Sequence, residues 1–203
     1  MRIITEKEVI EVLRSGGVVA MRSDTVYGLF ARADSSPAIQ RIFDIKGRIA
    51  TKGLPVLIAD SLQLNKVAVV DPGIRSRLES IWPTALTVIV PAKFDLISPV
   101  ATGQQDSVAL RCPDSFRLRH MIEILGVPLV ATSANLSGNA ECRSAQAVIL
   151  EFSGRSVVPD GVFDSGEVPL DVLPSTIIDL TSSEPRLIRA GGWTGDISLF
   201  SRL

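Results

Sequence analysis

Short apolar runs alternate with amphipathic segments along the chain, and this alternation is the feature that most restricts its fold. Residues 18–21 and 86–90 are apolar runs of the length of a buried strand. Residues 114–125, between two such runs, instead carry apolar side chains at helical spacing. The alternation is typical of α/β proteins, in which helices cover a sheet. We therefore predict one compact α/β domain over residues 1–203.

Cap and turn residues mark the ends of the expected elements. Thr5 and Glu8 form a capping box before the first helix, and Ser36, followed by a proline, opens the second. Asp71 caps a third helix that runs to residue 82. Further helices are expected at residues 114–125 and 144–152, and strands at residues 18–21, 54–58, 86–90, 107–110, 128–131, 175–180 and 186–188. Residues 153–174, rich in Gly, Pro and Asp, are expected to form a long surface excursion.

The charge balance and the scarcity of cysteine and histidine exclude several classes of protein. With 21 Lys+Arg against 22 Asp+Glu, the net charge of −1 argues against a protein that coats nucleic acid by bulk electrostatics. Cys112, Cys142 and the single His120 are too few for a four-ligand zinc site. His120 falls off the apolar stripe of its expected helix, so we expect no hydrolytic triad. No apolar run approaches the roughly 20 residues of a membrane-spanning helix, and we expect a cytoplasmic protein with no membrane partner.

A polar loop follows the first expected strand. It contains Ser23, Asp24 and Thr25, with Gly28 three residues beyond. Polar side chains at the carboxyl end of a strand are where α/β proteins place ligands. The same residues also suit a turn in which Asp24 and Thr25 bond their own backbone. The residues alone leave a binding loop and a simple turn equally open.

Three cations follow the second expected helix. Lys46 and Arg48 flank a glycine, and Lys52 stands four residues beyond the arginine. Several converging donors suit a phosphate chain, because Arg can chelate two oxygens while Lys acts as a point charge. Cations at a helix C-terminus, followed by a solvated loop, give the same pattern. Both interpretations remain open, and the absence of a Walker A pattern excludes the usual phosphate-binding loop.

Further polar groups stand on or after other expected strands, namely Ser107 with Arg111, residues 132–138 (TSANLSG), and Ser175 with Arg189. Ser107 and Arg111 are spaced to point to the same face of one strand, and Arg111, near its end, suits a carboxylate. Neutral hydroxyl and amide donors suit phosphate or sugar oxygens. Ser, Asn and Gly are also ordinary loop residues, so each group is a weak signal by itself.

Taken in order, these motifs resemble the threonylcarbamoyl-AMP synthase family, which has a YrdC-like domain. Residues 22–29 (RSDTVYGL) are similar to its P-T-[DE]-T-V-Y-G-L signature, and residues 46–48 (KGR) to its K-x-R loop. Residues 108–113 (VALRCP) resemble its A-V-R-x-P strand, residues 132–138 its T-S-A-N-x-S-G loop, and residues 174–176 its P-S-T strand. The resemblance implies the short, single-domain form, with a twisted mixed sheet flanked by helices around a concave basic cleft.

Members of this family join L-threonine, bicarbonate and ATP into L-threonylcarbamoyladenylate and pyrophosphate, for the N6-threonylcarbamoyl modification of adenosine 37 in tRNA. Positioning and charge neutralisation suffice for this chemistry, so no catalytic nucleophile is expected. The resemblance implies that L-threonine is bound by Thr25, Arg111 and Ser175. It implies that ATP is bound by Lys46, Arg48, Lys52, Ser107, Ser133, Asn135 and Arg189. Mg²⁺ is expected to be held mainly by the phosphates, without a dedicated protein site.

Two alternative functions stay open, the first of them because the sequence departs from the family pattern. Arg22 and Ser23 replace the usual Pro-Thr, and Thr84 and Ala85 replace a Gly-Pro pair. One alternative is a diverged paralogue without the activity. Another is a module that binds double-stranded RNA or tRNA through a basic concave face. If the enzymatic interpretation holds, the expected downstream partners are the proteins that transfer the threonylcarbamoyl group to tRNA.

Overall fold

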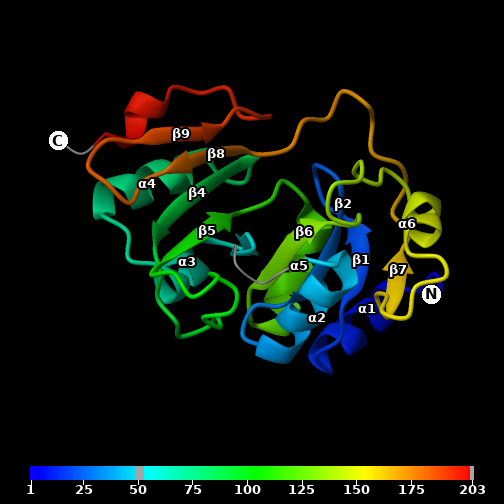
Figure 1. Cartoon of the computed structure of the whole chain (residues 1–203). Coiled ribbons are helices and arrows are strands. Elements are labelled where there is room, and N and C mark those ends of the chain that lie inside the picture. Colours follow the sequence, from blue (N-terminus) through cyan, green and yellow to red (C-terminus); the bar gives the residue numbers. More distant parts are fainter. Residues whose placement is uncertain (49–52, 202–203) are drawn as a thin grey trace.

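The computed structural model describes residues 1–48 and 53–201 (Figure 1). Its helices are α1 Glu6–Arg14, α2 Ser36–Lys46, α3 Ser61–Val67, α4 Pro72–Ile81, α5 Phe116–Leu125, α6 Ala145–Glu151 and the 3-10 helix η1 Ile197–Phe200. Its strands are β1 Val19–Arg22, β2 Tyr27–Arg32, β3 Val56–Leu57, β4 Leu86–Pro91, β5 Ser107–Arg111, β6 Leu129–Ser133, β7 Gly161–Phe163, β8 Thr176–Asp179 and β9 Arg186–Arg189.

The strands form one mixed sheet in the order β7-β1-β2-β6-β3-β5-β4-β8-β9. β1 pairs antiparallel with β2 and parallel with β7, while β4 pairs antiparallel with β5 and parallel with β8. Elements far apart in the sequence therefore lie side by side, as β2 and β6 do in Figure 1. The predicted mixed α/β sheet flanked by helices is confirmed.

Side chains of successive strand residues alternate between two cores, one on each face of the sheet. Val19 and Met21 of β1 pack in a smaller core with Leu13 of α1 and Met121 of α5. Ala20, between them, belongs to the larger core on the opposite face, together with the apolar residues of α2. Apolar side chains recur at helical spacing in α1, α2 and α5, so each of these helices buries one stripe against the sheet.

Helices α1 and α5 cover only part of their face of the sheet. Phe30 of β2 and Leu57 of β3 belong to the smaller core beneath these helices, and both also line a cavity. Leu57 lies beside Arg111 in the parallel β3–β5 pairing, so Arg111 points to the same face. The uncovered part of this face therefore holds the cavity into which polar residues of β5 and β6 can project.

The structure corrects several expected boundaries. Ser35, not Ser36, is the N-cap of α2, because its side chain accepts from the backbone N–H of Ala38. The helix expected at residues 114–125 begins at Phe116, with Ser115 as its N-cap. The strand expected at residues 54–58 contains only Val56 and Leu57. The starts of the two helices differ from the expected ones by one or two residues, as helix boundaries commonly do. The extent of the strand depends on its pairing with other strands, which only the tertiary fold decides.

The expected surface excursion at residues 153–174 is wrong in part, because it contains β7. β7 is only three residues long and pairs parallel with β1, so no local periodicity marks it. Three further elements, β2, α3 and η1, have no counterpart among the expected elements. The polar 23–26 segment is the short connection between β1 and β2, which explains why a strand follows it so closely.

Two expectations about excluded functions can be compared with the structure. The side chain of His120 is 50% exposed on α5 and stacks on the ring of Phe116, as expected for a surface histidine. Among the described residues, none of the helices combines the length and the apolarity that crossing a bilayer requires.

Candidate functional site

A cavity of about 250 Å³ lies on the part of the sheet that α1 and α5 leave open. Its apolar floor includes Phe30, Leu57 and Ala131. Its polar wall contains Ser23, Thr25, Thr87, Thr132, Ser133, Arg111, Glu141, Ser175 and Arg189. These wall residues come from distant parts of the sequence, and the sheet brings them together.

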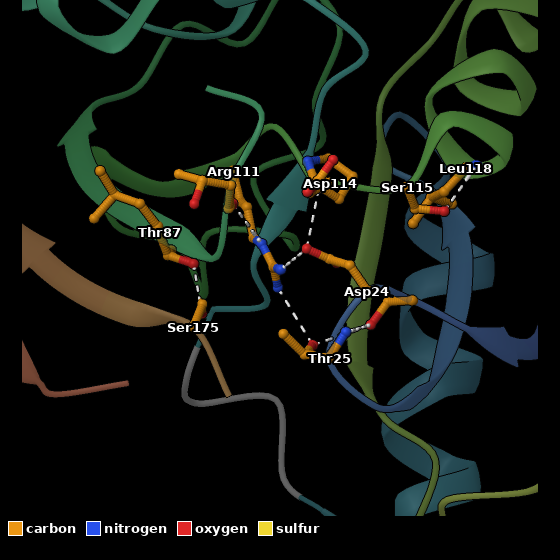
Figure 2. Close-up of polar contacts among 12 residues, drawn as sticks. Asp24, Thr25, Thr87, Arg111, Asp114, Ser115, Leu118 and Ser175 are labelled. Atoms are coloured by element: carbon orange, nitrogen blue, oxygen red, sulfur yellow. Dashed lines mark hydrogen bonds and ion pairs between the residues drawn. The ribbon is translucent and has the colours of Figure 1, made fainter. Parts of the chain in front are cut away.

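Arg111 ends β5 and lines this cavity, and its side chain contacts those of Asp24 and Thr25 (Figure 2). Its Nη2 donates to Oδ2 of Asp24, and the two side chains are only 8% and 9% exposed. Its Nη1 donates to Thr25 Oγ1 at 3.4 Å and its Nε to the carbonyl of Thr84 at 3.4 Å. Asp24 Oδ2 also accepts from the backbone N–H of Asp114 at 3.0 Å. Burial lowers the pKa of Arg111 and the charge of Asp24 opposes that change, so Asp24 favours the charged guanidinium.

The loop between β1 and β2 is held by Ser23. Its Oγ accepts from the backbone N–H groups of Thr25 at 3.1 Å and Val26 at 3.2 Å, and lies 3.0 Å from Thr25 Oγ1. Because Ser23 supplies these local hydrogen bonds, Asp24 and Thr25 are available to contact Arg111. The segment is therefore a turn whose Asp24 and Thr25 side chains contact Arg111, and ligand binding by this loop stays a prediction.

Ser175, directly before β8, forms another part of the wall. Its Oγ lies 2.8 Å from Oγ1 of Thr87 on β4 (Figure 2). Arg189 of β9 donates to the Ser175 carbonyl from Nε at 3.0 Å and from Nη2 at 2.7 Å. The chain then passes so closely that a Cβ on Gly191 would lie 2.2 Å from the carbonyl oxygen of Pro174. A glycine is required there, because any other residue would clash with the backbone that presents Ser175.

Lys46, at the end of α2, is buried and holds the loop that follows β6. Its Nζ donates to the carbonyls of Ser133 at 2.7 Å and Asn135 at 2.9 Å, and to Asn135 Oδ1 at 3.1 Å. An ammonium group has three protons, so these contacts occupy all of them. Burial lowers the pKa of Lys46 to about 8, and the neighbouring charge of Arg48 adds to this effect.

The lowered pKa of Lys46 predicts a specific pH dependence of stability. Between pH 8 and the ordinary lysine value of 10.5, the unfolded chain retains a proton that the folded chain has released. The free energy of unfolding should therefore rise with pH across this window, and at pH 10 it should be about 2 kcal/mol higher than at pH 7. Urea unfolding of the wild type and of Lys46→Met at pH 7 to 10 measures it. The difference between the two proteins should change with pH in favour of the wild type, and a constant difference would contradict the prediction.

The structure brings five of the predicted site residues into the wall of one cavity, namely Thr25, Arg111, Ser133, Ser175 and Arg189. Ser107 instead lines a neighbouring cavity of about 230 Å³, which includes Ala109 of the same strand. Lys46 and Asn135 lie behind the wall and contact each other. Arg48 is half-buried and is not part of the wall. Lys52 lies outside the described residues.

Sequence reasoning missed three residues of this site. The sequence places Asp24 in a loop that could be a binding loop or a turn, and its pairing with Arg111 depends on the fold. Thr87 carries a usable signal, since it is a polar residue inside an otherwise apolar strand. Glu141 follows the 132–138 loop and has no local pattern that marks it. Its place in the wall is known only from the tertiary structure.

The site has few groups that could bind a metal directly. Within residues 1–48 and 53–201, no three His, Cys, Asp or Glu side chains are grouped as a metal site requires. Asp24 is already paired with Arg111, which makes it a poor ligand for a cation. Mg²⁺ bound mainly by phosphate oxygens fits these residues and stays a prediction.

Comparison with known proteins gives a consistent assignment. Residues 11–191 match the Sua5/YciO/YrdC family model, described as "Telomere recombination". The chain is 37% identical over 184 residues to the threonylcarbamoyl-AMP synthase of Bacillus subtilis (strain 168), covering 90% of this chain and 52% of that protein. It is 32% identical over 173 residues to the threonylcarbamoyl-AMP synthase of Haemophilus influenzae (strain 86-028NP), covering 83% of this chain and 93% of that protein.

A solved structure agrees with these relatives. The crystal structure of Pyrococcus abyssi Sua5 complexed with L-threonine matches with a TM-score of 0.84 and 36% identity, covering 92% of this chain and 54% of that one. The chain thus spans about half the length of this protein and of the Bacillus relative, and nearly the full length of the Haemophilus one. From its motifs, its sheet and these matches, the chain belongs to the Sua5/YciO/YrdC family.

Proposed function

We propose that the protein is an L-threonylcarbamoyladenylate synthase, a nucleotidyltransferase that uses L-threonine, bicarbonate and ATP. The observation that carries the proposal is the buried Arg111, which shares a cavity with the hydroxyl groups of Thr25 and Ser175. Arg has five N–H donors, and the contacts with Asp24, Thr25 and Thr84 use three of them. One N–H on each terminal nitrogen is left for the carboxylate of an amino acid. A relative that binds L-threonine in its crystal structure supports the same assignment.

The reaction requires positioning rather than a nucleophile of the protein. The amine of threonine adds to bicarbonate-derived CO₂, and the carbamate oxygen then attacks the α-phosphorus of ATP. The new bond joins that oxygen to phosphorus, the bond to the bridging oxygen breaks, and pyrophosphate leaves. Burial raises the pKa values of Cys112 and Cys142 to about 11, so both thiols are protonated at neutral pH. A mechanism in which side chains hold the reactants together fits these residues.

ATP would lie across the same face of the sheet, next to the amino acid. Ser133 and Arg189 line the cavity, and the cavity that contains Ser107 lies further along β5. Arg48 and Lys52 remain the proposed phosphate contacts, while Lys46 and Asn135 would support the Ser133 loop. Mg²⁺ bound to the phosphates would neutralise part of their charge. The product would be consumed in the cytoplasm by proteins that modify adenosine 37 of tRNA.

The proposal is tested by incubating the protein with labelled bicarbonate, ATP, Mg²⁺ and one amino acid at a time, and by measuring the labelled adenylate and pyrophosphate. Threonine should be the best substrate. A pocket that bonds a hydroxyl rejects analogues without it strongly, whereas one methyl group changes the rate by about 10- to 200-fold. Serine should therefore be a poor but detectable substrate, and valine much worse. Equal activity with valine and threonine would contradict a hydroxyl-reading pocket, and no adenylate with any amino acid would contradict the proposed function.

A further inference from the structure

A second cavity, of about 210 Å³, lies beside the one of about 250 Å³ and takes no part in the proposed reaction. Ser23 lines both cavities, whereas Thr25 lines only the larger one and Asp24 only the smaller one. The loop between β1 and β2 therefore separates the two. Of the described residues assigned to L-threonine or ATP, none lines the second cavity.

The floor of the second cavity is apolar. Met21 of β1 and Leu118 and Met121 of α5 line it, and all three are buried members of the smaller core. Phe163, the last residue of β7, also lines it and packs against the same core. Methionine side chains adapt to groups of varied shape and make favourable contacts with aromatic rings. The floor therefore suits the apolar body of a ligand.

Two arginines that line the second cavity differ in their partners. The guanidinium carbon of Arg117 lies 5.3 Å from the centroid of the Phe163 ring, and its Nε lies 3.3 Å from a carboxylate oxygen of Glu6. Arg22 Nη1 donates at 2.6 Å to the backbone carbonyl of Glu167, an uncharged acceptor. That bond uses one of the five N–H donors of a guanidinium. Within residues 1–48 and 53–201, Arg22 forms no ion pair.

The two acidic residues of this cavity leave the charge of Arg22 unbalanced. Asp24 is bonded to Arg111, and Figure 2 shows its carboxylate turned toward that guanidinium. The side chain of Asp114 is 72% exposed, and its carboxylate lies 4.0 Å from Arg119. Each acid thus has a cation of its own. The second cavity combines an apolar floor with one cation that has no carboxylate partner in the described parts of the chain.

This combination favours a small organic anion over an inorganic ion or a neutral molecule. The cavity is smaller than the roughly 300–1,000 Å³ of pockets for drug-sized ligands, so its ligand must be small. An inorganic ion would leave the apolar floor in contact with water, and a neutral molecule would leave Arg22 without a counter-charge. A carboxylate matches a guanidinium, because its two oxygens accept two parallel hydrogen bonds.

We infer that the second cavity binds a small monocarboxylate with an apolar body of the size of a benzene ring, and that Arg22 pairs with the carboxylate. The apolar body lies on Met21, Met121 and Phe163. Arg22 stands where the family signature has a proline, so this site is a feature of this chain and not of the family pattern. The inference goes beyond the proposed function and does not depend on it.

The test uses benzoate and benzamide, which share a ring and differ in charge. Titration of the ¹⁵N-labelled protein, followed by NMR, gives the affinity and the residues whose signals shift. The wild type should bind benzoate at least tenfold more tightly than benzamide, with shifts at residues 21–24, 117–121 and 163–165. Arg22→Met should lose about tenfold of this preference. Arg22→Lys should retain part of it, because a point charge replaces the guanidinium fork.

A matched control separates Arg22 from the general charge of the protein. Arg14 also donates to a backbone carbonyl, that of Ile124, and it does not line the second cavity. Arg14→Met should leave the preference for benzoate unchanged. Equal losses in Arg14→Met and Arg22→Met would overturn the inference, because long-range attraction would then explain the preference.

The other outcomes are equally distinct. If benzoate shifts the signals of Arg111 and Ser175 and is displaced by L-threonine, it occupies the larger cavity and the inference is wrong. If the wild type binds benzoate and benzamide equally, or neither, Arg22 does not select an anion and the inference is also wrong. Failure of the adenylate assay would contradict the proposed function alone, since none of these titrations measures catalysis.

Discussion

Replacing Asp24 with alanine should lower the free energy of unfolding by about 3–5 kcal/mol, the cost of leaving one member of a buried ion pair alone. Arg111 would keep its charge at a site where its side chain is only 8% exposed, with hydroxyl and carbonyl acceptors at 3.4 Å as its remaining partners. The backbone N–H of Asp114 would also lose its acceptor. Urea unfolding at neutral pH measures the change.

A double-mutant cycle separates the ion pair from ordinary loss of packing. Asp24→Ala combined with Arg111→Met removes both charges, and should be less destabilised than Asp24→Ala alone, because no uncompensated charge remains. Lys7→Ala, which removes an exposed pair with Glu11, is the control and should change stability by at most about 0.5 kcal/mol. Additive effects of the two single substitutions at Asp24 and Arg111 would show that the pair does not act as a unit.

Replacing Gly191 with alanine should reduce threonine-dependent pyrophosphate release by about a hundredfold, as a displacement of about 1 Å in a binding residue can do. The added Cβ would lie 2.2 Å from Pro174 O and 2.6 Å from both Ser175 C and Thr176 N. These are backbone atoms, so the start of β8 must move. Ser175 would move with it and lose its contacts with Thr87 and Arg189. Overpacking of this kind should also cost about 1–3 kcal/mol of stability.

The next residue provides the control for this steric argument. A Cβ on Gly192 would have as its nearest neighbour the Cβ of Ala85 at 3.2 Å, a contact that a small adjustment relieves. Gly192→Ala should therefore change stability by no more than about 1 kcal/mol and leave the activity within about fivefold of wild type. Steady-state pyrophosphate assays and thermal melts of both variants are compared. Equal losses of activity and stability at the two positions would mean that reduced chain flexibility causes them, and not the close approach of Gly191 to the backbone.

Local sequence determined the secondary structure where one signal dominates. The capping box at Thr5 and the cap at Asp71 place the starts of α1 and α4 correctly, because the bonds that satisfy a helix terminus are formed by neighbouring residues. The apolar run at residues 86–90 becomes β4, because a run of this length and composition is typical of a buried strand. Where two polar residues compete for one cap, as Ser35 and Ser36 do, the sequence does not separate them.

The ordered motifs also determined much of the site. They single out Thr25, Arg111, Ser133, Ser175 and Arg189, and all five line the same cavity. Their roles toward threonine and ATP stay predictions. The motifs predict the residues of the site because they are typical of positions that this fold brings together. The spacing of these residues along the chain gives no distance between them.

Only the tertiary structure decided which of these residues bond to each other and which charges remain unpaired within the described parts of the chain. β7 forms because it pairs with β1, and no pattern within its three residues requires a strand. Asp24 pairs with Arg111 because the β1–β2 loop and the end of β5 meet across the sheet, 87 residues apart in sequence. Glu141, which follows the 132–138 loop, lies in the cavity wall without a bonded partner among the described residues. Residue type and periodicity are local properties, whereas the pairing of charges depends on which distant strands become neighbours.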